Sequence, residues 1–144
     1  MSGIIIHCDG ASRGNPGRAA AAFVVINSGK VIHKSGKLLG VNTNNVAEYS
    51  AVIEALSWLQ IDRGLLVGKP VEQTLTFILD SQLIVNQLNG IYKIKNLTLQ
   101  KLAHSAKKLE KDIGQKIVYR NVPRAENHVA DTLVNQILDG EFTG

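Results

Sequence analysis

Hydrophobic residues in this chain follow the spacing of β-strands as far as Leu39, and after it they follow an alternation of helices and strands. The first part holds three apolar segments, at residues 4–8, 20–26 and 31–39. Turn residues separate them, at 14–17 (Gly-Asn-Pro-Gly) and at 28–29 (Ser-Gly). Because both connections are short, we expect the three strands to form an antiparallel meander.

The second part of the chain alternates helical and strand patterns. It predicts a helix over 46–59 capped by Asn44 and Asn45, a loop over 64–70, a strand over 74–79, helices over 81–88 and 99–109, a strand over 116–122 and a helix over 127–138. Strands that are joined through helices run parallel. The order βββαβααβα therefore predicts an α/β fold, with a five-stranded mixed sheet flanked by helices.

Composition limits what such a fold can be. With 144 residues, 44% of them hydrophobic and 19% charged, the chain can bury a core of its own as one domain over residues 1–144. The net charge of +4 permits an anionic partner such as nucleic acid without requiring one. The single cysteine, Cys8, excludes an internal disulfide and a cysteine-based zinc site. No apolar run is long enough to span a bilayer, and no signal-peptide pattern is present. We expect a cytoplasmic monomer that needs neither a membrane nor a protein partner.

Two aspartates follow predicted buried strands. Asp9 comes after the strand at 4–8 and Asp80 after the strand at 74–79. If these strands are neighbours, their carboxyl ends lie about 5 Å apart, and two carboxylates at that distance raise each other's pKa. There is no Lys or Arg within three residues of Asp80. A divalent cation would relieve the repulsion, and oxygen ligands without His or Cys suit Mg²⁺ or Mn²⁺.

Each acidic residue also has an ordinary structural interpretation. Asp9-Gly10 is typical of a turn, and Asp80-Ser81 can cap the helix that follows. Glu48 lies three residues after Asn45, as in a capping box. Asp131 lies near the start of the last predicted helix, where an acid stabilises the helix dipole. Taken singly, these residues do not indicate a metal site.

Four short segments contain these acids, and together they resemble the signature segments of ribonuclease H type 1. In chain order they are Asp9-Gly10-Ala11-Ser12-Arg13-Gly14-Asn15-Pro16-Gly17, Thr43-Asn44-Asn45-Val46-Ala47-Glu48, Asp80-Ser81-Gln82 and Asn127-His128-Val129-Ala130-Asp131. They stand in the family's order, and the resemblance covers essentially the whole chain. It implies the ribonuclease H fold, with which the expected order of elements agrees.

The resemblance implies an enzyme that hydrolyses the RNA strand of an RNA/DNA hybrid and leaves a 3′-hydroxyl and a 5′-phosphate. The family's catalytic carboxylates, which hold two Mg²⁺ ions or Mn²⁺ in their place, match Asp9, Glu48, Asp80 and Asp131. By this match Asp9 bridges both ions and Asp131 completes the ion that holds the attacking water. Glu48 and Asp80 hold the ion at the leaving oxygen. Two such ions generate hydroxide near neutral pH and stabilise charge on both oxygens.

The same match implies the substrate contacts. An amide can both donate to and accept from a ribose 2′-hydroxyl, and the matching amides are Asn15, Asn44, Asn45 and Gln82. For Asn44 and Asn45, helix capping is the alternative role. Thr43 and Asn96 resemble the family's phosphate pocket for the DNA strand. A basic surface could follow the nucleic-acid backbone, although an ordinary solvated face is the alternative; its members are Arg13, Lys93, Lys95, Lys107, Lys108, Lys111 and Lys116.

Two features depart from the fuller family pattern. Many members carry a basic, Trp-rich protrusion that grips the hybrid, whereas the segment 88–96 here is short and has no Trp, so we expect weaker binding. Members also often carry a mobile His before the last catalytic Asp. Here His128 falls within the predicted helix, on a face away from Asp131. Arg124 precedes it and could act on phosphate, but as a permanent cation it cannot be a general base.

Three other functions stay open. A catalytically silent hybrid-binding module would share the fold but gain nothing from clustered acids. Another nuclease on the same fold, such as a junction resolvase or a transposase-like enzyme, would cut DNA, whereas the Asn44-Asn45 and Ser81-Gln82 pairs favour recognition of a 2′-hydroxyl. A nucleotide-binding α/β protein would need a glycine-rich loop with a Lys at phosphate spacing, which the sequence lacks.

Overall fold

The computed structural model of the chain describes residues 3–61 and 74–141. Its elements are β1 (Ile4–Arg13), β2 (Gly17–Asn27), β3 (Lys30–Asn42), α1 (Asn44–Ile61), β4 (Thr74–Leu79), α2 (Gln82–Leu88), α3 (Leu97–Ile113), β5 (Lys116–Asn121), the 3₁₀ turn η2 (Arg124–Asn127) and α4 (His128–Leu138). The expected order of strands and helices, βββαβααβα, is confirmed. The loop expected over 64–70 lies outside the described residues.

The strands form one mixed sheet with the order β3-β2-β1-β4-β5. β2 runs antiparallel to both β1 and β3, whereas β4 runs parallel to both β1 and β5. This is the predicted meander followed by parallel strands. β1, which carries Asp9, and β4, which ends directly before Asp80, are therefore neighbours.

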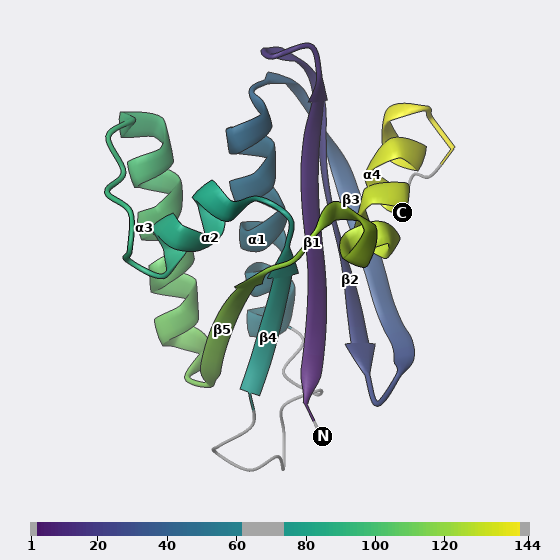
Figure 1. Ribbon diagram of the computed structural model, residues 1–144. Coiled ribbons are helices and arrows are strands. Elements are labelled where there is room, and N and C mark those ends of the chain that lie inside the picture. The colour runs from purple at the N-terminus through teal and green to yellow at the C-terminus, as the bar shows by residue number, and fades with distance from the viewer. Residues whose placement is uncertain (1–2, 62–73, 142–144) are drawn as a thin grey trace.

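Helices cover both faces of the sheet (Figure 1), with α1, α2 and α3 on one side and α4 on the other. Alternate residues of a strand point to opposite faces, and β2 is buried on both. Toward α1 it presents Ala21, Phe23 and Val25, and toward α4 it presents Ala20, Ala22 and Val24. The near-continuous apolar run of β2 follows from this double burial.

β1 does not end at Cys8 as expected but continues through Asp9 and Gly10 to Arg13. The interpretation of Asp9-Gly10 as a turn is therefore wrong. The glycine is required for another reason: a Cβ at position 10 would lie 2.1 Å from the backbone carbonyl of Ala47. Only a residue without a side chain allows α1 to approach β1 this closely, right beside Asp9.

The start of α1 also differs from the expectation. Thr43 caps the helix, since its Oγ1 accepts a hydrogen bond from the backbone N–H of Val46 at 3.2 Å. Neither Asn44 nor Asn45 is the cap. The Oδ1 atom of Asn44 instead accepts a hydrogen bond from the backbone N–H of Ser12 at 2.8 Å, which ties the end of β1 to the helix.

The remaining boundaries lie close to the predicted ones. β5 ends at Asn121, and the last helix begins at His128 after the turn η2, which the sequence pattern does not reveal. Within the described parts of the chain, no helix is long and apolar enough to cross a membrane.

Candidate active site

Three carboxylates from three elements meet at one edge of the sheet. Asp9 lies on β1, Glu48 on the second turn of α1 and Asp80 directly after β4, and one oxygen atom of each lies within 4.8 Å of the others. Asp9 and Glu48 are buried, and Asp80 is half-buried. The pairing of β1 with β4 brings the two aspartates together, and the close contact at Gly10 brings α1, with Glu48, against them. The sequence made the meeting of Asp9 and Asp80 conditional on the two strands being neighbours, and the sheet order meets that condition.

Glu48 is held by β1 and not by the start of its own helix. Its Oε1 atom accepts a hydrogen bond of 2.7 Å from the backbone N–H of Gly10. The capping-box interpretation is therefore wrong, because Thr43 caps α1 and Glu48 turns toward the strand. The second oxygen, Oε2, is buried and has no hydrogen-bond partner among the described residues. A buried carboxylate oxygen without a donor is costly unless a cation or a proton occupies it.

The electrostatics of the cluster reflect this crowding. Burial, together with the charges of Asp80 and Asp131, raises the pKa of Asp9 to about 7. Burial and the charge of Asp9 raise the pKa of Glu48 well above its usual range. The pKa of Asp80 is also raised, mainly by burial, although Arg124 opposes the rise. The protein thus holds three carboxyl groups in an arrangement that disfavours their charged forms.

A divalent cation fits this donor set. All the converging ligand atoms are carboxylate oxygens, which are the ligands that Mg²⁺ and Mn²⁺ prefer. The orphaned Oε2 of Glu48 is a carboxylate oxygen that is already desolvated. Bound cations would also remove the repulsion that raises the three pKa values. Asp9, Glu48 and Asp80 can therefore hold a metal ion.

Asp131, the fourth predicted carboxylate, lies on α4 beside this cluster but outside the group of three. It is close enough to Asp9 to raise the pKa of that residue. Its Oδ1 atom accepts from Nη2 of Arg124 at 3.0 Å, an ion pair between η2 and α4. The structure therefore gathers all four predicted carboxylates at one site, with a guanidinium on the fourth.

Family comparison agrees with this geometry. A family model described as RNase H matches residues 1–138. The chain belongs to the RNase H family. The resemblance seen in its four segments is confirmed.

Relatives of known sequence include a bifunctional protein of Mycobacterium tuberculosis, 38% identical over 138 residues, which are 94% of this chain and 35% of that protein. Ribonuclease HI of Halobacterium salinarum is 36% identical over 132 residues, which are 91% of this chain and 62% of that protein. The chain thus spans about a third of the length of the mycobacterial relatives that it matches.

Among solved structures, the RNase H1 named LC11, isolated from compost, superimposes with a TM-score of 0.87 at 38% identity, covering 99% of this chain and 100% of that one. A second structure of LC11 RNase H1, in complex with an RNA/DNA hybrid, gives a TM-score of 0.86 at 37% identity, over 97% of this chain and 99% of that one. The fold of this chain is that of RNase H1.

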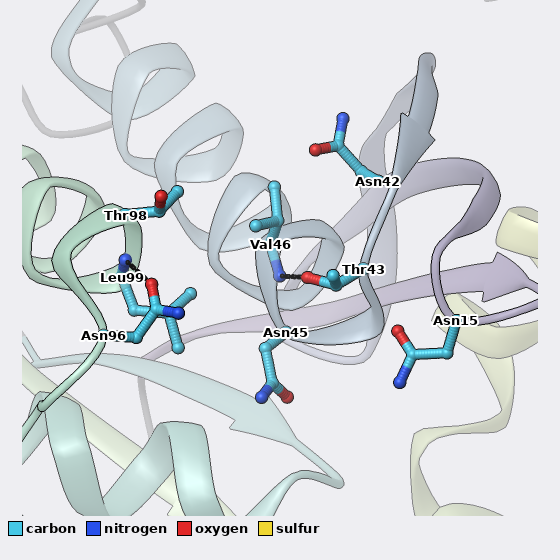
Figure 2. A pocket seen from close by; sticks show the side chains of 8 residues that line it. All are labelled: Asn15, Asn42, Thr43, Asn45, Val46, Asn96, Thr98 and Leu99. Atoms are coloured by element: carbon cyan, nitrogen blue, oxygen red, sulfur yellow. Dashed lines mark hydrogen bonds between the residues drawn. The ribbon is translucent and has the colours of Figure 1, made fainter.

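Two hollows flank the start of α1 in this RNase H. The first, of about 340 Å³, holds the carboxylates and is lined by Asp9, Gly10, Ala11, Asn44, Asn45, Glu48, Asp80, Ser81 and Arg124. The second, of about 420 Å³, is lined by Asn15, Asn42, Thr43, Asn45, Val46, Asn96, Thr98 and Leu99 (Figure 2). Asn45 lines both. Thr43 and Asn96, matched to a phosphate pocket from sequence, do lie in one hollow.

Some side chains that line these hollows also form hydrogen bonds that stabilise the fold. Asn96 caps α3, because its Oδ1 accepts from the backbone N–H of Leu99 at 3.0 Å (Figure 2). Asn15 accepts from the backbone N–H of Asn44 at 3.1 Å. The side chain of Asn45 makes no hydrogen bond to another described residue. Its amide points into the space between Asn15 and Asn96 (Figure 2). Asn45 is thus the amide with the most freedom to meet a ligand.

Gln82 lines neither hollow and is exposed at the first position of α2, two residues after Asp80. The cap of α2 is Ser81, whose Oγ accepts from the backbone N–H of Ile84 at 3.3 Å. The capping interpretation of Asp80-Ser81 is thus correct for the serine, which leaves the carboxylate of Asp80 free to face Asp9.

Two members of the predicted basic surface pair with acids of the protein itself. Arg13 forms an ion pair with Asp139 at 2.6 Å. The Nζ atom of Lys107 donates to the carbonyl of Leu88 at 2.6 Å, pairs with Glu110 at 3.3 Å and lies 5.6 Å above the ring of Tyr119. Lys107 therefore fastens α3 to α2. Lys93 and Lys95 are exposed in the short connection between these helices.

Residues that sequence reasoning missed are Asn42 and Thr98 in the second hollow, and Asn127 at the start of α4. The one feature of the sequence that could have indicated Thr98 as a lining residue is its place two residues after Asn96. Asn127 is the first residue of the fourth signature segment, but an Asn before a helix reads as an ordinary cap.

Proposed function

We propose that residues 1–144 form a catalytic domain that hydrolyses the RNA strand of RNA/DNA hybrids and leaves 3′-hydroxyl and 5′-phosphate ends. The observation that carries this proposal is the convergence of Asp9, Glu48 and Asp80 in a chain of the RNase H family. None of the three forms an ion pair with a Lys or Arg side chain in the part of the chain that the structure describes. A protein that only bound the anionic backbone would be hindered by such a cluster.

Two divalent ions, Mg²⁺ or Mn²⁺ in its place, would supply the hydroxide and the stabilisation of charge that phosphodiester hydrolysis needs. Asp9, central in the cluster, would be shared between them. Glu48 and Asp80 would complete the site at the leaving oxygen, and Asp131 the site of the attacking water. The backbone N–H of Gly10 would orient Glu48 for this role by holding Oε1, which leaves the buried Oε2 without a donor and open to a cation.

Arg124 would bind the substrate's phosphate. Its guanidinium lines the carboxylate hollow and is largely exposed, which suits a group that must reach an incoming anion. It holds Asp131 in place until then. As a permanent cation it does not act as a base, so proton transfer would use water and the carboxylates.

Substrate selection would come from the two hollows. Asn45, which lines both, and the exposed Gln82 would contact the ribose 2′-hydroxyls of the RNA strand, with Asn15 and Asn44 shaping the loop beside them. Thr43 and Asn96 would hold a phosphate of the DNA strand in the second hollow. The LC11 RNase H1, solved with an RNA/DNA hybrid, supports the choice of substrate. We further propose that the domain acts as a monomer in the cytoplasm.

The test is cleavage of one labelled RNA/DNA hybrid in Mg²⁺, with parallel lanes for duplex RNA, duplex DNA and a DNA–RNA–DNA chimera that carries one ribonucleotide. The expected result is cleavage of the hybrid RNA strand, none of duplex DNA, and loss of activity in Asp9→Asn. Binding without cleavage would favour a silent hybrid-binding module. Cleavage of duplex DNA would favour another nuclease on the same fold.

A further inference from the structure

Asn127 is fully buried where η2 passes into α4. It holds the N-cap position of α4, yet its side chain makes no capping hydrogen bond. An Asn at this position usually accepts from an N–H of its own helix and stabilises it. In this chain the amide binds another element instead.

Both ends of the Asn127 amide contact β1 directly before Asp9. The Nδ2 atom donates to the carbonyl oxygen of Cys8 at 2.8 Å, and Oδ1 lies 2.9 Å from Nδ1 of His7. Since Nδ2 is the donor toward Cys8, Oδ1 is the acceptor, and His7 carries its proton on Nδ1. The carbonyl of Cys8, which can only accept, therefore fixes which way the amide points, and the contact with Nδ1 of His7 holds the oxygen end of the amide.

The contact lies where β1 loses its parallel neighbour. The pairing of β1 with β4 ends at His7 and Ile78. The next carbonyl of β1, that of Cys8, is the one bound by Asn127. The side chain thus links α4 to β1 immediately past the last strand pair.

This link joins the two halves of the carboxylate site. Asp9 follows Cys8 on β1, and Asp131 lies about one helical turn after Asn127 on α4. Arg124 lies at the start of the same 3₁₀ turn that ends at Asn127. We propose that Asn127, held on β1 by the carbonyl of Cys8 and by His7, is a positioning residue that sets the distance of Asp131 and Arg124 from Asp9. The catalytic part of this inference rests on the proposed function.

Residues that hold metal-binding groups in place commonly change metal affinity or activity by about 10- to 100-fold when they are removed. Asn127→Ser is the informative variant, because serine can cap α4 but is too short to make both contacts with β1. We expect kcat for hybrid cleavage to fall about tenfold or more. KM should change less than about twofold, since the side chains of the two hollows remain.

A second readout does not depend on cleavage. Mg²⁺ binding to the folded state raises Tm by an amount that depends on the ratio of the Mg²⁺ concentration to Kd. The Kd fitted to a series of Mg²⁺ concentrations, which is the midpoint of Mg²⁺ binding, reports how well the carboxylates converge. We expect this midpoint to increase several-fold in Asn127→Ser. The matched control is Tyr119→Phe, which removes a partly buried hydrogen bond of 2.6 Å from the Tyr119 hydroxyl to Glu110, away from the site. It should lower Tm without moving the midpoint or kcat.

His7 supplies a rescue pair. His7→Phe keeps the ring volume but removes the Nδ1 donor, and it should reproduce a part of the Asn127→Ser defect in both kcat and midpoint. His7→Asn places an amide N–H near the position of Nδ1 and should restore most of it. These variants also serve if Asn127→Ser fails to fold.

A wild-type kcat and midpoint in Asn127→Ser would overturn the proposal, as would an equal loss in Tyr119→Phe, because either result leaves Asn127 a purely structural residue. Equal defects in His7→Phe and His7→Asn would overturn the part assigned to His7. If the wild-type protein cleaves no hybrid, the proposed function fails, whereas the Mg²⁺ midpoints still decide whether Asn127 positions the carboxylates.

Discussion

Arg124 and Asp131 form an ion pair of 3.0 Å between η2 and α4, at the rim of the hollow that holds Asp9, Glu48 and Asp80. The side chain of Arg124 is 73% exposed, so the pair contributes little to stability. A phosphate offers Arg124 the same charge and the same bidentate geometry as a carboxylate. The side chain can therefore exchange Asp131 for a phosphate without losing a strong partner.

Arg124→Ala should lower kcat/KM for hybrid cleavage about tenfold or more, equivalent to about 1.4 kcal/mol of transition-state stabilisation. His128→Ala should lower it only modestly, because His128 contacts Thr132 at 3.3 Å and lines a different hollow, beside Val24 and Lys34. Steady-state kinetics on one hybrid compares the two. A loss of two orders of magnitude in His128→Ala would make His128 the proton-handling residue instead.

Asp9→Asn, Glu48→Gln and Asp80→Asn should each nearly abolish cleavage while the fold persists. Without Mg²⁺, their thermal stability should equal or exceed that of the wild type, since each removes one of several repelling charges. Glu54→Gln is the matched control on α1, because Glu54 pairs with Lys37 at 2.9 Å and gains nothing from neutralisation. Thermal melts with and without Mg²⁺ measure this. Unfolding or wild-type turnover in Asp80→Asn would contradict the metal assignment.

The order of elements was predictable because it depends on local patterns, and so was the place of Asp9 and Asp80 at the ends of buried strands; that these strands are neighbours was a condition that the structure met. Apolar runs mark buried strands, and acids that follow adjacent parallel strands must share an edge. Asp131 and Glu48 were found through resemblance alone, since each had a satisfactory local explanation.

The wrong predictions share a cause, which is contact between residues distant in sequence. The sequence places Gly10 in a turn, whereas in the structure it lets the backbone of Ala47 in α1 approach β1. The sequence suggests that Glu48 is a capping residue, whereas in the structure its Oε1 accepts from the backbone N–H of Gly10. In each case the local signal was real, and a tertiary contact overrode it.

The stability of the metal-free protein should fall as pH rises from about 4 to about 7. Asp9 has a pKa of about 7 in the folded chain, against 3.8 as its ordinary value, so between these limits the folded state holds more protons than the unfolded state. The free energy of unfolding should decrease by at least about 1.4 kcal/mol, the equivalent of a pKa difference of one. Denaturant titrations with EDTA at pH 5 and pH 7.5 measure the change.

The same titration in Asp9→Asn should show a smaller decrease, and saturating Mg²⁺ should reduce the decrease in the wild type, because the cation replaces the protons. A pH dependence of stability that is identical in wild type and Asp9→Asn would show that Asp9 is not the group responsible.

The last prediction concerns the choice between hybrid and duplex DNA. Gln82, exposed beside Asp80, is proposed to contact a ribose 2′-hydroxyl, and losing such a hydrogen bond costs about 1–3 kcal/mol only on substrates that carry the hydroxyl. Gln82→Ala should therefore weaken hybrid binding, measured in Ca²⁺ so that the hybrid is not cleaved, with little change in affinity for duplex DNA.

Lys93→Ala and Lys95→Ala are the contrasting variants, because an exposed lysine meets phosphates on either substrate. Each should weaken both complexes and reduce the slope of log K against log salt by about one. The wild-type slope should already be shallow, since the connection between α2 and α3 is short and carries no Trp-rich protrusion.

Equal losses of affinity for hybrid and duplex DNA in Gln82→Ala would mean that Gln82 only positions the nucleic-acid backbone. Selectivity would then have to come from Asn45, from backbone groups around the carboxylates, or from the width of the hybrid groove.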